Sequence, residues 1–138
     1  MVGNSLFEKT MYIAQRSLGA DTLRKKVIAN NIANVDTPHY KRHTVTFESE
    51  MNRALQEERK TRFLLNTTHE RHIPGFKVKH FSETAPRVHV EFNTNYRNDK
   101  NNVDIEKEIS DEVKNSLHYS AMTTAVGNNY RKLRSVMA

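Results

Sequence analysis

The strongest constraint on this chain is a seven-residue spacing of apolar side chains in its N-terminal segment. The spacing is kept by Leu6, Ile13, Ala20 and Val27. A spacing of seven keeps an apolar stripe on one side of a helix, where a second helix can pack along its length. No proline occurs before Pro38, so the segment 5–33 is predicted to form one helix, about 44 Å long.

A second long helix is predicted over 104–138. Asp104 is placed to cap its first turn, acidic residues gather at its start and basic residues at its end, which complements the helix dipole. Its stripe consists of Ile109, Tyr119, Val126, Tyr130 and Leu133. We therefore expect a mainly α fold in which the two terminal helices pair as a coiled-coil-like hairpin. The stripes are also candidates for contacts between subunits, and the pattern alone does not separate these two roles.

The segment between the helices is polar and rich in turn-forming residues. A short helix is predicted over 48–60, a short strand over the alternation at 88–92, and a mobile loop over the asparagine-rich stretch 93–102. The chain is thus predicted to be one structural unit in three parts: the N-terminal helix and turn (1–40), a largely irregular polar outer insert (41–103) and the C-terminal helix (104–138).

The composition excludes several classes of protein. Only 36% of the 138 residues are hydrophobic, and no apolar run approaches the roughly 18 residues needed to span a membrane. There is no cysteine, which excludes a disulfide scaffold and cysteine-ligated metal centres. The first residues have no basic start followed by an apolar core, so we expect no cleaved secretory signal.

The usual signatures of catalysis and metal binding are missing from the sequence. Two pairs of histidines lie close together, His39 with His43 and His69 with His72, but neither pair has the further ligands at the spacing of a zinc site. The four glycines form no phosphate-binding loop, and no serine lies in a nucleophile elbow. The sequence predicts no catalytic residue, no metal site and no cofactor, and therefore a protein that is not an enzyme.

A formal net charge of +6 permits an anionic partner. Basic clusters at 24–26, 41–42 and 59–62 are able to neutralise phosphates, so a helical nucleic-acid-binding protein is one alternative. The same clusters are equally suited to pair with acidic neighbours, and the acidic start of the C-terminal helix is such a neighbour. A soluble helical adaptor or export chaperone is a further alternative, since it would keep the seven-residue spacing.

The most informative motif lies where the N-terminal helix should end. Asparagine amides near a helix end can satisfy backbone carbonyls, proline fixes the turn, and a tyrosine adds an aromatic contact. These residues are Asn30, Asn31, Asn34, Pro38 and Tyr40. The motif resembles the signature of the flagellar rod, hook and axial protein family, in which a helix runs into Asn-Asn-x-Ala-Asn and then Thr-Pro-Gly-Tyr. The segment 102–106 and the end of the C-terminal helix resemble that family independently.

The resemblance is greatest to the smallest, proximal rod members, and a second short rod protein is the competing assignment. It implies a structural subunit of the bacterial flagellar basal-body rod that assembles helically and transmits motor torque. It also implies export through the flagellar type III apparatus to the periplasm. The implied partners are other copies of the chain, other rod proteins, an adaptor at the rod base and the inner-membrane MS ring, with no nucleic acid. One departure is His39, which stands where the family has glycine.

Overall fold

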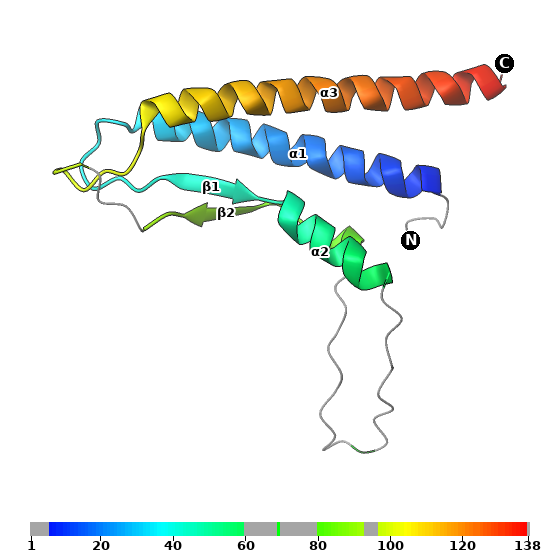
Figure 1. Cartoon of the computed structure of the whole chain (residues 1–138), viewed down its shortest axis with the longest axis horizontal. Helices are drawn as coiled ribbons and strands as arrows, with labels where there is room; N and C mark the ends of the chain where they lie inside the picture. Colours follow the sequence, from blue (N-terminus) through cyan, green and yellow to red (C-terminus); the bar gives the residue numbers. More distant parts are fainter. Residues whose placement is uncertain (1–5, 60–68, 70–79, 93–96, 138) are drawn as a thin grey trace. The chain divides into compact units, whose positions relative to one another are not determined.

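The computed structural model describes residues 6–59, 69, 80–92 and 97–137 (Figure 1). Its elements are, in chain order, α1 (Leu6–Ala33), β1 (His43–Thr46), α2 (Glu48–Arg59), the 3₁₀ helix η1 (Phe81–Glu83), β2 (Arg87–Val90) and α3 (Ile105–Met137). The chain forms two compact units, Met1–Thr46 with Ala85–Ala138, and Phe47–Thr84. The predicted division at 40 and 103 stays a prediction.

The first unit is built on α1 and α3, which lie antiparallel and in contact along their lengths (Figure 1). The prediction of a mainly α fold with two long terminal helices packed together is confirmed. Asp104 caps α3, because its Oδ1 accepts a hydrogen bond of 3.0 Å from the Glu106 amide. At 1.5 Å per residue, the 33 residues of α3 extend about 50 Å.

The surfaces that the two helices bury differ in chemistry. On α1 the buried residues include alanine, valine and isoleucine side chains, together with Asp21 and Asn31. On α3 the only fully buried residues are polar, Glu108 and Asn115, which lie seven positions apart. On α3, therefore, the two buried positions at a spacing of seven are polar. Several apolar side chains of α3 lie outside the contact between the two helices.

A two-stranded antiparallel sheet completes the first unit. His43 of β1 is paired with Val90 of β2, and Thr46 with Arg87. β1 contacts α1, and β2 lies on the side of β1 away from α1, with all four of its residues exposed (Figure 1). The alternation at 88–92 correctly predicted a strand, although the strand begins and ends earlier.

The second unit consists of α2 and η1, which contact each other. Its buried apolar side chains are Phe47, Met51, Ala54 and Phe81. The predicted short helix at 48–60 is confirmed as α2. His80 caps η1, because its imidazole accepts a hydrogen bond from the Ser82 amide.

One loop of the chain has a burial that the sequence did not predict. The stretch 93–102 was expected to be a mobile loop, and its first residues, 93–96, lie outside the described residues. The end of the stretch is among the most buried parts of the first unit: Asn101 is 0% exposed and Asn102 is 7% exposed. The amides of both residues are used up in hydrogen bonds to backbone groups elsewhere. Among the described residues, no helix combines the length and the hydropathy that crossing a bilayer requires.

Candidate assembly surface and polar junction

A cluster of buried polar side chains joins the end of α1, the start of β1 and the start of α3. We call it the polar junction, and it consists of Asn31, Arg42, Asn101, Asn102 and Glu108. Each of these residues is at most 7% exposed. Buried polar groups are tolerated only when they are hydrogen-bonded, so the pairing of each member decides whether the junction stabilises the chain.

Asn31 uses the whole hydrogen-bonding capacity of its amide. Its Nδ2 donates to the carbonyl of His43 at 2.8 Å and to Glu108 Oε2 at 3.0 Å. Its Oδ1 accepts from the His43 amide at 3.0 Å and from the Tyr40 hydroxyl at 3.3 Å. The side chain therefore pairs with both backbone groups of His43, as a neighbouring strand would, and fixes β1 to α1. No other side chain of this size has the two donors and one acceptor oxygen that this requires.

Arg42 holds the acidic start of α3. Its guanidinium contacts the buried Glu108, and it also lies 3.1 Å from Glu91 and 3.0 Å from Asp111. Burial alone would lower the pKa of Arg42, but the hydrogen bonds and negative charges of Glu108 and Glu91 outweigh it, so the pKa is raised above its ordinary value. The arginine is therefore charged, and its guanidinium pairs with the buried Glu108.

Asn101 caps the C-terminal end of α1 from the far end of the chain. Its Nδ2 lies 2.9–3.0 Å from the carbonyls of Asn34, Val35 and Thr37. Its Oδ1 accepts from the Val103 amide at 2.8 Å. Carbonyls at a helix end have no partner within the helix, and here a side chain more than 60 positions later supplies it.

Asn102 performs a similar role at the end of the sheet. The amide of Glu91 donates to the carbonyl of Arg42 at 2.9 Å. In a regular sheet the Arg42 amide would donate to the Glu91 carbonyl in return. Here the side chain of Asn102 lies between these two groups: its Oδ1 accepts from the Arg42 amide at 2.6 Å, and its Nδ2 donates to the Glu91 carbonyl at 2.7 Å. Asn102 thus inserts its amide between the strands where they separate.

The five predicted residues of the signature turn have different environments. Asn31 is buried, Asn34 and Tyr40 are half-buried, and Asn30 and Pro38 are exposed. Asn34 satisfies a helix carbonyl as expected, since its Nδ2 donates to the Asn30 carbonyl at 2.8 Å. The structure brings Asn31 and Tyr40 together. The role of the whole set in leading the chain from the inner helix outward stays a prediction.

His39 keeps the backbone conformation that glycine adopts most easily. Its φ is 64°, in the left-handed region. A residue with a side chain adopts this region at a cost, and histidine is among the more tolerant. The His39 amide donates to the carbonyl of Asp99 at 3.0 Å, so the segment 97–103 holds the turn in this conformation.

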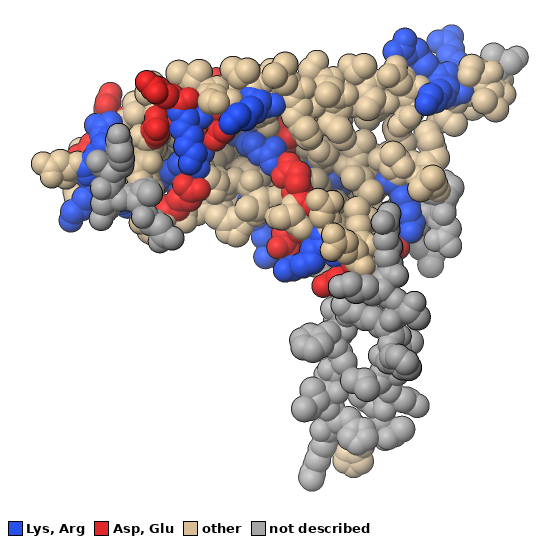
Figure 2. Space-filling view, in the orientation of Figure 1, with Lys and Arg blue, Asp and Glu red and all other residues tan. Residues whose placement is uncertain are grey.

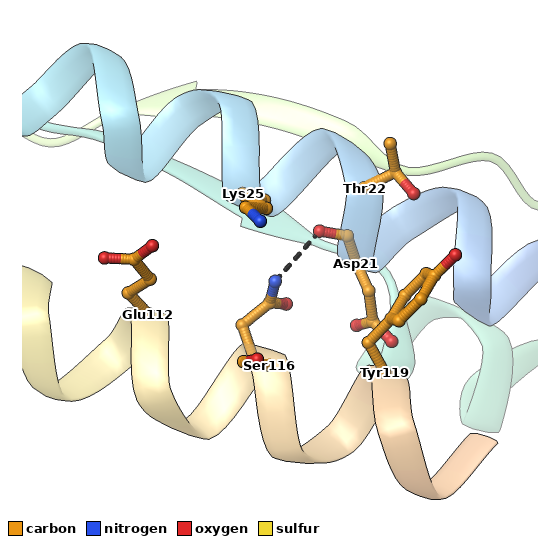
Figure 3. Close-up of a pocket in the computed structure, with 7 residues that line it drawn as sticks. Asp21, Thr22, Lys25, Glu112, Ser116 and Tyr119 are labelled. Carbon is orange, nitrogen blue, oxygen red and sulfur yellow. Dashed lines mark hydrogen bonds between the residues drawn. The ribbon is translucent and has the colours of Figure 1, made fainter. Parts of the chain in front are cut away.

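A second polar cluster joins the middles of α1 and α3. The carboxylate of Asp21, which is 0% exposed, lies 2.8 Å from Arg24 and 2.7 Å from Nδ1 of His118. The side chain of Asn115 donates to the Asp21 carbonyl at 3.0 Å (Figure 3). Asp21 interrupts an apolar row in the sequence, and the structure shows the reason: its buried carboxylate pairs with Arg24 on α1 and is hydrogen-bonded to His118 of α3.

A cavity of about 310 Å³ lies beside this cluster (Figure 3). α1 contributes Asp21, Thr22 and Lys25, and α3 contributes residues that include Glu112 and Tyr119. The cavity lies between the two helices because their contact here is made by polar side chains rather than by interlocking apolar ones.

The nine predicted stripe residues divide into three groups. Ala20 and Val27 are buried within the chain, and Ile13 and Val126 are half-buried. The remaining residues are exposed: Leu6, Ile109, Tyr119, Tyr130 and Leu133. Their assignment to contacts between subunits stays a prediction.

The most continuous exposed apolar surface of α3 lies near its start. It consists of Ile105, Ile109, Val113 and Leu117, which are 44–67% exposed and which we call the α3 apolar row. Residues four apart lie on one face of a helix, and this face is turned away from the buried Glu108 and Asn115. A contiguous exposed apolar row of this kind is a candidate interaction surface.

Three members of the basic clusters make contacts within the part of the chain that the structure describes. Arg24 binds Asp21, Arg42 binds Glu108, and Lys41 donates to the carbonyl of Lys100. On the face shown in Figure 2, basic and acidic side chains alternate near the start of α3, and basic side chains gather at its C-terminal end. Most of the cluster at 59–62 lies outside the described residues. The structure therefore does not favour a phosphate-binding surface.

The part of the chain that the structure describes contains no group of three or more histidines and carboxylates arranged to hold a metal ion. The predicted close pair His69–His72 has only its first member among these residues.

Sequence reasoning missed Arg42, Asn101, Asn102 and Glu108 as parts of one site. Arg42 and Glu108 were seen only as members of a basic and an acidic cluster. A usable signal was present, since the basic residues after the turn and the acidic start of the C-terminal helix have opposite charges. The pairing of individual residues, however, depends on the antiparallel placement of α1 and α3.

Comparison with known proteins identifies the family. Residues 11–41 match the family model described as flagella basal body rod protein. The chain is 35% identical over 133 residues to the flagellar basal body rod protein FlgB of Borrelia hermsii, covering 96% of this chain and 98% of that protein. It is 34% identical to FlgB of Borreliella burgdorferi, with 95% and 97% coverage, and 30% identical to FlgB of Bacillus subtilis, with 96% coverage of both chains.

Proposed function

This chain belongs to the FlgB family of flagellar basal body rod proteins, and on that premise we propose that it is a proximal rod subunit whose α3 apolar row packs against neighbouring subunits. Its role is structural, as a subunit of the flagellar basal body rod. FlgC-type rod proteins were the competing assignment, and the FlgB relatives named above match the chain over nearly its full length. The chain performs no catalysis in this proposal.

The proposed partners are other basal-body components. They comprise further copies of the chain, FlgC-type and FlgF-type rod proteins, an adaptor at the rod base and the inner-membrane MS ring. The chain reaches the periplasmic rod through the flagellar type III export apparatus without cleavage of a signal peptide.

The α3 apolar row is the observation that carries this proposal. Four aliphatic side chains along about three turns of α3 are exposed. The two buried residues of α3, by contrast, are both polar. Burying such side chains contributes about 25 cal/mol per Å² of apolar surface. A neighbouring helix that covers the row would gain this free energy on assembly.

The polar junction supports the mechanical part of the proposal. A rod that transmits torque needs subunits that do not bend where their helices meet the rest of the chain. Arg42 connects β1 to α3, and Asn31 connects α1 to both. Directional hydrogen bonds in a buried network fix one geometry more strictly than apolar packing does.

The test replaces one exposed side chain of the row. Leu117 is 67% exposed and makes no polar contact among the described residues. Leu117→Glu should leave the helix content and unfolding midpoint of the purified chain unchanged, but abolish swimming and rod assembly in a strain that lacks the natural copy. Leu117→Met, which keeps the apolar surface, is the matched control. Intact rods in the Leu117→Glu strain would contradict the proposed role of the row.

A further inference from the structure

The outer edge of β2 has backbone groups without partners. Because the Glu91 amide points to β1, and because strand residues alternate in direction, the amides and carbonyls of Val88 and Val90 point away from β1. No hydrogen bond joins them to another described residue, and both side chains are exposed, at 45% and 39%. Such an edge is a template for another strand.

The residues along this edge are complementary to themselves. From Arg87 to Glu91 the sequence reads Arg-Val-His-Val-Glu. When two copies of this strand run antiparallel about His89, Arg87 of each copy lies opposite Glu91 of the other. Each Val88 lies opposite a Val90. Opposite charges and β-branched pairs directly across from each other both stabilise a sheet.

The hydrogen-bond pattern allows the same register. In an antiparallel pair, residues directly opposite each other exchange both backbone bonds at every second position. Centring the pair on His89 places the outward-pointing Val88 opposite the outward-pointing Val90, so the free groups of the two edges meet. Pro86 has no amide hydrogen and ends the ladder at the next pair.

We propose that the β2 edge is a docking surface for a second copy of this chain, which pairs β2 with β2 antiparallel about His89 into a four-stranded sheet. Arg87 forms no ion pair with another described residue. Glu91 contacts Arg42, but its side chain is still 43% exposed. Both are therefore accessible to the second copy. The surface is separate from the α3 apolar row, and the proposal does not depend on assembly into the rod.

The experiment measures self-association of the full chain and its charge dependence. The contact is small, so we expect a dimer with a dissociation constant on the order of 0.1–1 mM. Sedimentation and amide NMR spectra are followed from about 10 µM to about 1 mM. The amide signals of Val88 and Val90 should shift with concentration, and that of His89, which points to β1, should not.

Charge variants provide the decisive comparison. Arg87→Glu places like charges opposite each other at both ends of the pair and should weaken association about tenfold or more. Glu91→Arg should do the same. An equimolar mixture of the two variants restores opposite charges at both ends, so association should return to within about threefold of the natural chain.

Two further variants serve as an independent test of the strand edge and as a control. Val88→Pro removes one outward amide without touching the bonds to β1, and it should abolish association even if Glu91→Arg fails to fold. Lys132→Glu reverses one exposed charge near the C-terminal end of α3, outside both proposed surfaces, and should leave association unchanged. The proposal is overturned if the natural chain stays monomeric, if Arg87→Glu or Val88→Pro associates normally, if folded mixed variants do not recover association, or if Lys132→Glu weakens association as much as Arg87→Glu does.

Discussion

Asn31 of α1 and Glu108 of α3 are 77 positions apart, and a hydrogen bond of 3.0 Å joins Nδ2 of the first to Oε2 of the second. Both residues are at least 99% buried. The bond connects the asparagine-rich end of the first helix to the acidic start of the last one. It makes the signature turn part of the core of the first unit rather than a surface connection.

Asn31→Ala should destabilise the chain more than its position in a polar turn suggests. The change removes four hydrogen bonds and leaves buried partners of the amide unsatisfied, at about 1–3 kcal/mol for each such group. We expect a loss of about 3 kcal/mol or more in the free energy of unfolding, measured by urea denaturation. Asn30→Ala, at an exposed neighbour, is the control and should change stability little. Equal effects of the two variants would contradict the role given to Asn31.

Glu108→Ala tests the charge pairing in the polar junction. Without this carboxylate, the 8% exposed side chain of Arg42 keeps only the more exposed Glu91 and Asp111 as partners. Removing one member of a buried ion pair costs about 3–5 kcal/mol. Glu106→Ala, on an exposed residue of the same helical turn, should stay within about 0.5 kcal/mol of the natural chain in the same denaturation experiment. A stable Glu108→Ala variant would show that the pair does not hold the junction together.

Asn101→Ala should act at a distance in the sequence. It removes the side chain that caps the carbonyls of Asn34, Val35 and Thr37. We expect a loss of about 2 kcal/mol and faster amide hydrogen exchange around residues 34–40, with α2 unaffected. Asn98→Ala, at an exposed position of the same loop, serves for comparison. If the amide hydrogen exchange rates around residues 34–40 did not change, the capping role of Asn101 would be contradicted.

The backbone of His39 predicts opposite effects for two substitutions. At a φ of 64°, His39→Gly relieves the cost of the left-handed conformation, which is about 1 kcal/mol for residues with a side chain. This gain is partly offset by the greater freedom of glycine in the unfolded chain. His39→Val should lose about 1–2 kcal/mol, because a β-branched residue fits this region poorly. Thermal unfolding of the three chains should rank them glycine, histidine, valine, and any other position of valine would contradict the geometry.

Tyr40 predicts a fall in stability at alkaline pH. Burial and the negative charge of Glu108 raise the pKa of Tyr40 above its ordinary value. The folded chain therefore holds the phenolic proton more tightly than the unfolded chain, and this contribution to stability is complete below about pH 10 and is lost as the pH rises through the folded pKa. Tyr40→Phe lacks this dependence, so the stability difference between the two chains should narrow above about pH 10 in urea denaturation.

The architecture was predictable because it rests on periodicity and local signals. The seven-residue rows gave both terminal helices, and Asp104 marked the start of α3 by its capping position. The polar junction was not predictable in the same way. Arg42 and Glu108 look like any solvated charges in a sequence, and they become partners only when α1 and α3 lie side by side. Asn101 follows a run of loop-forming residues, so its burial contradicts the local composition and depends entirely on distant carbonyls.

The capping of α1 by Asn101 also sets an order of events. The hydrogen bonds of this cap join residues 64–67 positions apart, and the bond between Asn31 and Glu108 spans more. A chain that is made, or threaded through a channel, from its N-terminus has an incomplete first helix end until about three quarters of it has emerged. Closing so long a loop costs more entropy than closing the short-range contacts of the turn, such as that of Asn31 with His43. The end of the helix that carries the family signature is therefore capped only once the segment around Asn101 is present, so a chain shortened before that segment would keep the signature but lose the cap.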